Sequence, residues 1–248
     1  MQHSRHMILL LLVFLVSPLL ATAANQPDAV CADCHTNTGG EPSEVGYEHL
    51  EGSIHQDLLC IDCHSGITEL PHGPVLAEPD CGTCHDDVAN TYVQHGRGIV
   101  GISNEVPNCQ ECHGSHHILS HTNTQSRVHS SNLPETCGSC HEDQDFLEEL
   151  GIKFKHPIEV YQSGVHGQAT AGGKDTAASC NDCHSTGGTA HRILPPGHVE
   201  STINFFNISK TCGKCHGTIQ VEYEEGIHGD FVARGEVDAP TCTQCHGE

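Results

Sequence analysis

One short pattern constrains this 248-residue chain more than any other feature, because it uses all 16 cysteines. Every cysteine belongs to a Cys-x-x-Cys-His pentapeptide, so the pattern occurs eight times. With 23 histidines in the chain, a histidine in all eight places has a chance probability of roughly 10⁻⁸. The sites, numbered 1 to 8 in chain order, begin at Cys31, Cys60, Cys81, Cys109, Cys137, Cys180, Cys212 and Cys242. Their second cysteines are Cys34, Cys63, Cys84, Cys112, Cys140, Cys183, Cys215 and Cys245.

The pentapeptide is the signature of covalent c-type haem attachment. On a helical turn, residues i, i+3 and i+4 share one face, so two thiols can bond one porphyrin while the histidine binds its iron. Disulfide pairing requires no histidine here, and zinc takes ligands from separate pairs rather than from contiguous triplets. The sequence predicts eight covalently bound c-type haems and middle residues that vary freely between the two thiols. The expected proximal iron ligands are His35, His64, His85, His113, His141, His184, His216 and His246.

The second axial ligand is expected to be histidine at every site. The only methionines are Met1 and Met7, at the extreme N-terminus. Methionine ligation raises the potential of a haem, so its absence predicts low-potential haems with two histidine ligands each. Thirteen histidines after position 30 lie outside the pentapeptides, which is enough for eight second ligands.

Internal repeats rank these histidines. The first candidates are the leading histidines, which come before a site in a Val/Ile-His-Gly or similar segment. A tyrosine begins three of these segments, at Tyr92, Tyr161 and Tyr223. The following histidines come after a site, in segments such as His-His-Ile-Leu and His-Arg-Ile-Leu, and rank next. The leading histidines are His55, His95, His166 and His228, the following histidines are His72, His116 and His191, and His156 is a weaker candidate.

The sites group as one, three pairs and one, which divides the chain into segments. We expect a single-haem segment at 24–46, whose opening resembles the second half of a pair, and dihaem units at 47–90, 91–160 and 161–222. A last single-haem segment follows at 223–248. His116 comes three residues after His113, and its equivalent after His246 would be position 249. Either the last site uses another ligand or the sequence is truncated, and we expect truncation.

The composition excludes an ordinary side-chain core. Aromatic residues make up 4% of the chain and tryptophan is absent, so large buried rings cannot fill the interior. We expect a mostly α fold with extensive coil and little or no sheet, in which stacked haems form the core of a multihaem cytochrome c fold. Short helices are expected at 88–94, 144–150 and 157–163. The chain without haem should not fold.

The N-terminus indicates export. Positions 1–23 combine a weakly basic start, an apolar run and an Ala-Thr-Ala cleavage site, the layout of a signal peptide. The predicted location is periplasmic or extracellular, with no membrane span after cleavage. A formal charge of −22 argues against nucleic acid as a partner and favours basic docking surfaces.

The Tyr-x-x-Gly-Val-His-Gly and Thr-Cys-Gly-x-Cys-His segments resemble the doubled-CxxCH multihaem, or octahaem, c-type cytochromes, relatives of class III-type and octahaem respiratory cytochromes. The resemblance implies closely packed haems that act as an electron-transfer conduit in anaerobic respiration, not an enzyme. Its implied redox partners are a quinol-oxidising membrane cytochrome, a terminal reductase or an outer-surface acceptor. Two alternatives stay open: a multihaem reductase of a small nitrogen or sulfur oxyanion, and a subunit of an oligomeric cytochrome filament.

Overall fold

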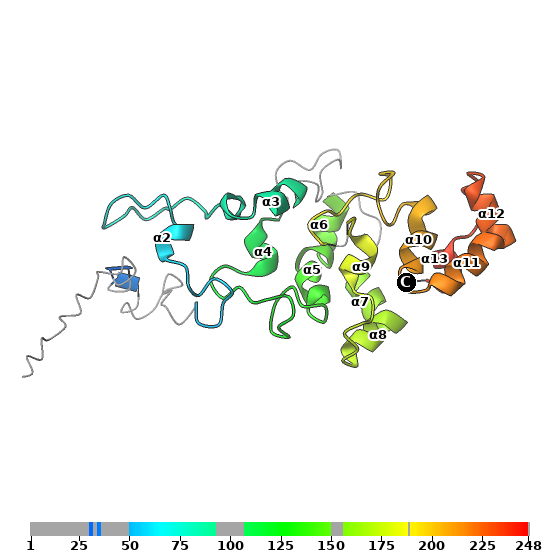
Figure 1. The fold of residues 1–248 in the computed structure, drawn as a ribbon, viewed down its shortest axis with the longest axis horizontal. Helices are drawn as coiled ribbons and strands as arrows, with labels where there is room; N and C mark the ends of the chain where they lie inside the picture. Colours follow the sequence, from blue (N-terminus) through cyan, green and yellow to red (C-terminus); the bar gives the residue numbers. More distant parts are fainter. Residues whose placement is uncertain are drawn as a thin grey trace, which may run out of the picture.

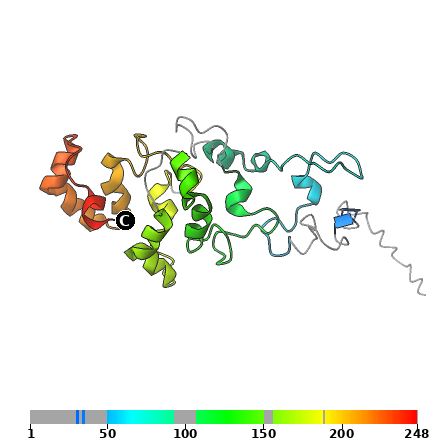
Figure 2. The ribbon, with the colours of Figure 1, turned by 180° about the vertical axis from the view of Figure 1, so that it is seen from behind.

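The computed structural model describes residues 30–31, 34–35, 50–92, 107–149, 156–187 and 189–247. The expected signal peptide lies outside these residues. Figure 1 shows an elongated molecule in which the site-bearing helices α2, α4, α5, α9, α10 and α13 succeed one another in chain order, while α12 lies at the far end. Figure 2 shows the same succession from behind. The segments that carry successive sites therefore form a row.

Short helices joined by turns make up the described part of the chain. The α-helices are α2 (Cys60–Cys63), α3 (Asp86–Tyr92), α4 (Cys109–His113), α5 (Leu133–His141), α6 (Gln144–Glu149), α7 (Pro157–Ser163), α8 (Val165–Ala171), α9 (Cys180–His184), α10 (Ile208–Gly213), α11 (Gly217–Glu225), α12 (Ile227–Ala233) and α13 (Cys242–His246). Two 3₁₀ helices are η2 (Cys81–Thr83) and η3 (Phe205–Asn207).

The expected fold class is confirmed. Within the described ranges, the only pairing of β type is one isolated bridge between Ser185 and Ile193. The three expected helices correspond to α3, α6 and α7, and Pro157 occupies the first position of α7. Proline suits that position because its missing N–H would have no partner there. In the same ranges, no helix is long and apolar enough to cross a membrane.

Apolar side chains of the described residues do not build a continuous core. The buried ones are Leu119, Leu133, Leu147 and Leu194. Large apolar side chains such as Val75, Val165 and Ile227 are instead mostly exposed. Folding normally removes such side chains from water, so another apolar body must cover them in the functional protein.

Two segments of the chain, 116–141 and 191–216, fold alike through the same hydrogen bonds. Ser126 donates its hydroxyl to the carbonyl of Leu119 at 3.2 Å, and Ser201 donates to Leu194 at 3.0 Å. The Asn132 amide donates to Ser126 O at 2.8 Å, as Asn207 does to Ser201 O, also at 2.8 Å. Polar side chains thus close both loops by bonding the backbone, a task that apolar packing performs in ordinary domains.

Tight helix corners hold two of the leading histidines. In α7–α8, a Cβ atom on Gly167 would lie 2.1 Å from the carbonyl oxygen of Tyr161. In α11–α12, a Cβ atom on Gly229 would lie 2.3 Å from that of Tyr223. Only glycine lets the two backbones come so close. The helix corner therefore requires glycine directly after His166 and directly after His228.

Candidate haem sites

Sites 2, 4, 6 and 8 form one structural class, which we call capped sites. Each is a short helix whose third residue turns its side chain back to accept the N–H of the residue before the first cysteine. The returning side chain satisfies an N–H at the start of the helix, where backbone donors have no partner within the helix. The bonds are Leu59 N to Asp62 at 2.8 Å, Asn108 N to Glu111 at 2.5 Å, Ser179 N to Asp182 at 2.7 Å and Thr241 N to Gln244 at 2.8 Å.

Sites 3, 5 and 7 form a second class, the glycine sites, with Cys-Gly-x-Cys-His sequences. A Cβ atom on Gly82 would lie 3.1 Å from Ala89 of α3, and one on Gly138 would lie 2.9 Å from Ile158 of α7. A Cβ atom on Gly213 would lie 3.0 Å from the Cβ of Gln220 in α11. A later helix thus packs across the glycine. The expectation that the middle residues vary freely is wrong, because they cap the helix in one class and admit a neighbouring helix in the other.

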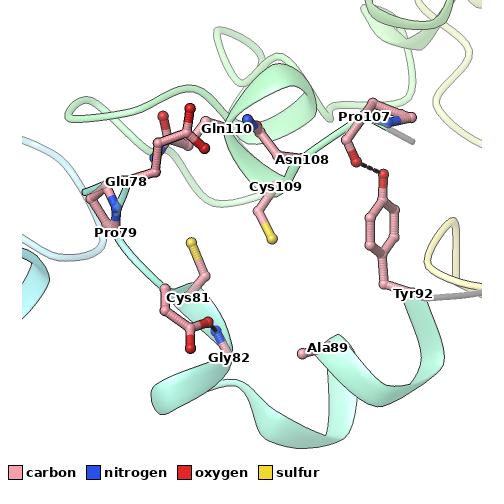
Figure 3. A pocket seen from close by; sticks show the side chains of 11 residues that line it. Glu78, Pro79, Cys81, Gly82, Ala89, Tyr92, Pro107, Asn108, Cys109 and Gln110 are labelled. Atoms are coloured by element: carbon pink, nitrogen blue, oxygen red, sulfur yellow. Dashed lines mark hydrogen bonds between the residues drawn. The ribbon is translucent and has the colours of Figure 1, made fainter. Parts of the chain in front are cut away.

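A tyrosine anchors the start of three capped sites. Tyr161 donates its hydroxyl to Ala178 O at 2.9 Å, and Tyr223 donates to Pro240 O at 3.0 Å. Tyr92 donates to Pro107 O, as the dashed line in Figure 3 shows. Each acceptor lies two residues before the first cysteine. Burial raises the pKa of Tyr92 and of Tyr223, so these hydroxyls keep the proton that they donate.

The structure brings five site histidines opposite five histidines from outside the pentapeptides. The ring centres lie 5.9 to 6.2 Å apart in every pair. Three pairs use following histidines and two use leading histidines. They are His35 with His72 at 5.9 Å, His64 with His116 at 6.2 Å, His113 with His191 at 5.9 Å, His55 with His85 at 6.0 Å and His166 with His216 at 6.2 Å.

This spacing fits a metal ion held between the two rings. A metal–imidazole bond of about 2.0–2.1 Å, as for zinc, and roughly 1.1 Å from nitrogen to ring centre put two opposed rings about 6.3 Å apart. The five observed separations lie just below that value. Burial, followed by His191 and His85, lowers the pKa of His113, which favours the neutral ring that binds metal.

The remaining candidates have different surroundings. His95 lies outside the described residues. The ring of His156 is 3.0 Å from the carboxylate of Glu142, and the residue caps α7 in a left-handed conformation (φ 53°). His228 and site histidine His246 are exposed. Burial, followed by His184, lowers the pKa of His141, which shows that the histidines of sites 5 and 6 are neighbours. Ligand roles for these residues stay predictions.

Cysteines of consecutive sites lie next to one another from site 2 to site 8. The thiol of Cys137 donates a hydrogen bond to the sulfur of Cys180, which raises the pKa of Cys137 and lowers that of Cys180. Burial, with Cys242 second, raises the pKa of Cys212 to about 11. The neighbouring cysteines are Cys63 and Cys84 (sites 2 and 3), Cys81 and Cys109 (3 and 4), Cys112 and Cys140 (4 and 5), Cys137 and Cys180 (5 and 6), Cys183 and Cys212 (6 and 7), and Cys212 and Cys242 (7 and 8).

A cavity of about 340 Å³ opens between sites 3 and 4. Figure 3 shows the thiols of Cys81 and Cys109 pointing into it from opposite walls, with Tyr92 along one side. Neither cysteine is in a disulfide. Thiols of two consecutive sites therefore face one shared space, where Cys81 and Cys109 would each hold a haem.

Comparison with known proteins supports this chemistry. A family model described as cytochrome c7 and related cytochrome c matches residues 21–86, which contain sites 1 to 3. No curated protein and no solved structure matches the chain. Over its first three sites the chain is thus similar to a family of multihaem electron-transfer cytochromes with covalently bound c-type haem.

Proposed function

We propose that this protein is an exported octahaem c-type cytochrome that conducts electrons along a row of eight haems. The five histidine pairs carry the proposal, because each combines one pentapeptide histidine with one other histidine at the spacing of a shared metal ion. Bound haem supplies the reversible iron redox couple. The protein positions each iron and sets its potential through ligands, burial and hydrogen bonds.

We propose second ligands for five sites from these pairs. Each following histidine passes over the nearest preceding site that is not a glycine site and serves the one before it: His72 serves site 1, His116 site 2 and His191 site 4. On this proposal site 1 takes a following histidine, as sites 2 and 4 do. Each leading histidine passes over the next site and serves the glycine site after it, as His55 and His166 do at sites 3 and 7. By the same rule, His95 serves site 5.

The neighbouring cysteines support conduction. Since thiols of consecutive sites are in contact or within electrostatic range from site 2 to site 8, porphyrins bonded to them would lie close to one another. The elongated row in Figure 1 spreads the sites along the long axis, so electrons can enter and leave far apart. We further propose a periplasmic or extracellular location, a role in anaerobic respiration, and basic redox partners that complement the charge of −22.

Intact-mass and redox measurements on the exported protein test this proposal together. We expect the mass of the chain from Ala24 plus eight haems, low-spin ferric haems with two nitrogen ligands, and rapid reduction of all eight by a single donor. Fewer haems would disprove the octahaem assignment. A high-spin haem that binds nitrite or sulfite would instead indicate the reductase alternative.

A further inference from the structure

The five histidine pairs share one spacing but differ in the angle between their ring planes. The ring planes are close to parallel in the pairs made by following histidines, with interplanar angles of 13° for His35–His72, 26° for His64–His116 and 16° for His113–His191. In the pairs made by leading histidines the rings are twisted, at 59° for His55–His85 and 47° for His166–His216. No pair lies between 26° and 47°.

The two angle classes coincide with the two classes of site. The parallel pairs occur at site 1 and at capped sites 2 and 4, and the twisted pairs occur at glycine sites 3 and 7. Capped and glycine sites alternate along the chain from site 2 to site 8. In the five pairs, ring orientation therefore changes with the origin of the second histidine, and at sites 2, 3, 4 and 7 it also changes with the middle residues of the pentapeptide.

Local structure holds His166 and His191 in different ways. His166 is part of α8, whose angle to α7 is set by Gly167, and its carbonyl accepts the Thr170 hydroxyl at 3.0 Å. The Tyr161 hydroxyl lies 3.0 Å from that of Thr170 and completes the corner. His191 lies instead in a turn, next to Arg192, whose carbonyl accepts Thr186 N at 2.8 Å. A helix thus presents the ring of His166, and a turn presents that of His191.

Ring orientation matters because it acts on the electrons of iron. In low-spin ferric haem, one electron is missing from a pair of iron d orbitals that overlap with the imidazole π systems. Parallel rings act on the same d orbital and separate it in energy from the other, whereas twisted rings act on both and leave them more nearly equal. Axial ligands are one of the means by which a protein sets the properties of a haem.

We propose that the row contains two alternating electronic classes of haem: parallel-ligand haems at site 1 and the capped sites, and twisted-ligand haems at the glycine sites. The inference rests on the proposed function, since it presupposes haem iron between the paired rings. Its consequence is that an electron moving along the row meets the two classes in turn. Leading and following histidines are thus orientation-determining residues as well as ligands.

Electron paramagnetic resonance of the oxidised, haem-loaded full chain tests this inference. We expect two sets of low-spin signals, with the lowest-field resonance of the twisted set at clearly higher g than that of the parallel set. Spectra at several poised potentials, where neighbouring haems are reduced and diamagnetic, remove broadening from spin coupling. Eight low-spin haems with a single type of signal would overturn the alternation while leaving the proposed function intact; missing or high-spin haems would instead contradict the proposed function.

Matched variants assign the signals. His191→Ala and His166→Ala each turn one haem high-spin, and subtraction from the wild-type spectrum isolates the signal that was lost. The signal lost in His166→Ala should have its lowest-field resonance at higher g than the signal lost in His191→Ala. His121→Ala, an exposed histidine outside the pairs, is the control and should lose neither. The reverse order of g values would overturn the assignment, and the wild-type spectrum decides the alternation even where a variant fails to fold.

Discussion

The two kinds of histidine pair differ in what they join. His55–His85 and His166–His216 lie within single predicted units, 47–90 and 161–222. His64–His116 and His113–His191 cross the boundaries to the next unit. The boundaries themselves stay predictions. On the proposed ligation, each dihaem unit supplies a ligand to the segment before it, so the repeats would be interlocked through iron, as neighbouring repeats of a solenoid are through apolar contacts.

Backbone contacts follow the crossing pairs. Beside His64–His116, the Ser53 hydroxyl donates to Ile118 O at 3.1 Å and Ile54 N donates to the same oxygen at 2.8 Å. At the next boundary, the Ser179 hydroxyl donates to Ser130 O at 2.9 Å. On the proposed ligation, the ligand pairs add to these polar bonds in joining the units.

The largest effect should follow from preventing haem attachment altogether. Without haem both kinds of pair are lost, and the four buried leucines cannot offset the conformational entropy of ordering the chain. We expect the haem-free chain to lack cooperative unfolding by circular dichroism and to be digested rapidly by protease, in contrast to the loaded protein. Cooperative unfolding of the haem-free chain would show that the polypeptide has a sufficient core of its own.

Removing one pair of each kind separates their roles. His191→Ala and His166→Ala should both keep eight covalent haems, as measured by intact mass, and both turn one haem high-spin. Loss of a metal ligand is among the changes with large effects, on the order of 4 kcal/mol. Only His191→Ala should expose the boundary between units 91–160 and 161–222 to limited proteolysis. Equal cleavage in both variants would disprove the distinction between joining and internal pairs.

A smaller effect is expected from the helix corner that orients His166. Gly167→Ala places a Cβ atom 2.1 Å from Tyr161 O, so the corner must open, at a cost of about 3 kcal/mol. Chemical denaturation measures the loss. Gly197→Ala is the matched control, because a Cβ atom there meets nothing within 4 Å, and its stability should stay near that of wild type. Similar losses of stability in both variants would contradict the role of Gly167 in the α7–α8 corner.

The smallest effect concerns the tyrosine anchor. Tyr161→Phe removes the bonds to Ala178 O and to Thr170 and should destabilise the protein by about 1–2 kcal/mol, since each hydrogen bond contributes roughly 1 kcal/mol. Tyr223→Phe removes one bond of the same kind and should cost about half as much. Thermal unfolding compares the two, and a larger loss in Tyr223→Phe would contradict the account.

The sequence revealed the sites but not their connections. Cysteine spacing predicts eight attachment points, and repeats select seven leading and following histidines, five of which the structure pairs with site histidines. Pairing could not be predicted, because His166 passes over the adjacent site 6 and meets His216, 50 positions along the chain. Long-range register of this kind depends on how loops such as 191–216 fold, and their hydrogen bonds give no motif strong enough to recognise beforehand.

The middle residues of the pentapeptides show a second limit. Glu111 has a longer side chain than Asp62 and Asp182, and Gly82 differs from all of them, so the set looked unconstrained. The structure shows two separate requirements: at capped sites a middle residue caps the helix, and at glycine sites a middle residue leaves room for a neighbouring helix. Because the two classes of site alternate along the chain, their middle residues resemble random variation until the sites are grouped by the structural elements around them.

Anomalous diffraction at the iron edge, from crystals of the haem-loaded protein, tests the central claim most directly. It locates every iron independently of the polypeptide. The account predicts eight irons in one row, five of them midway between the rings of His35–His72, His64–His116, His55–His85, His113–His191 and His166–His216. An iron bound to one of these site histidines with a different residue on its opposite side would contradict it.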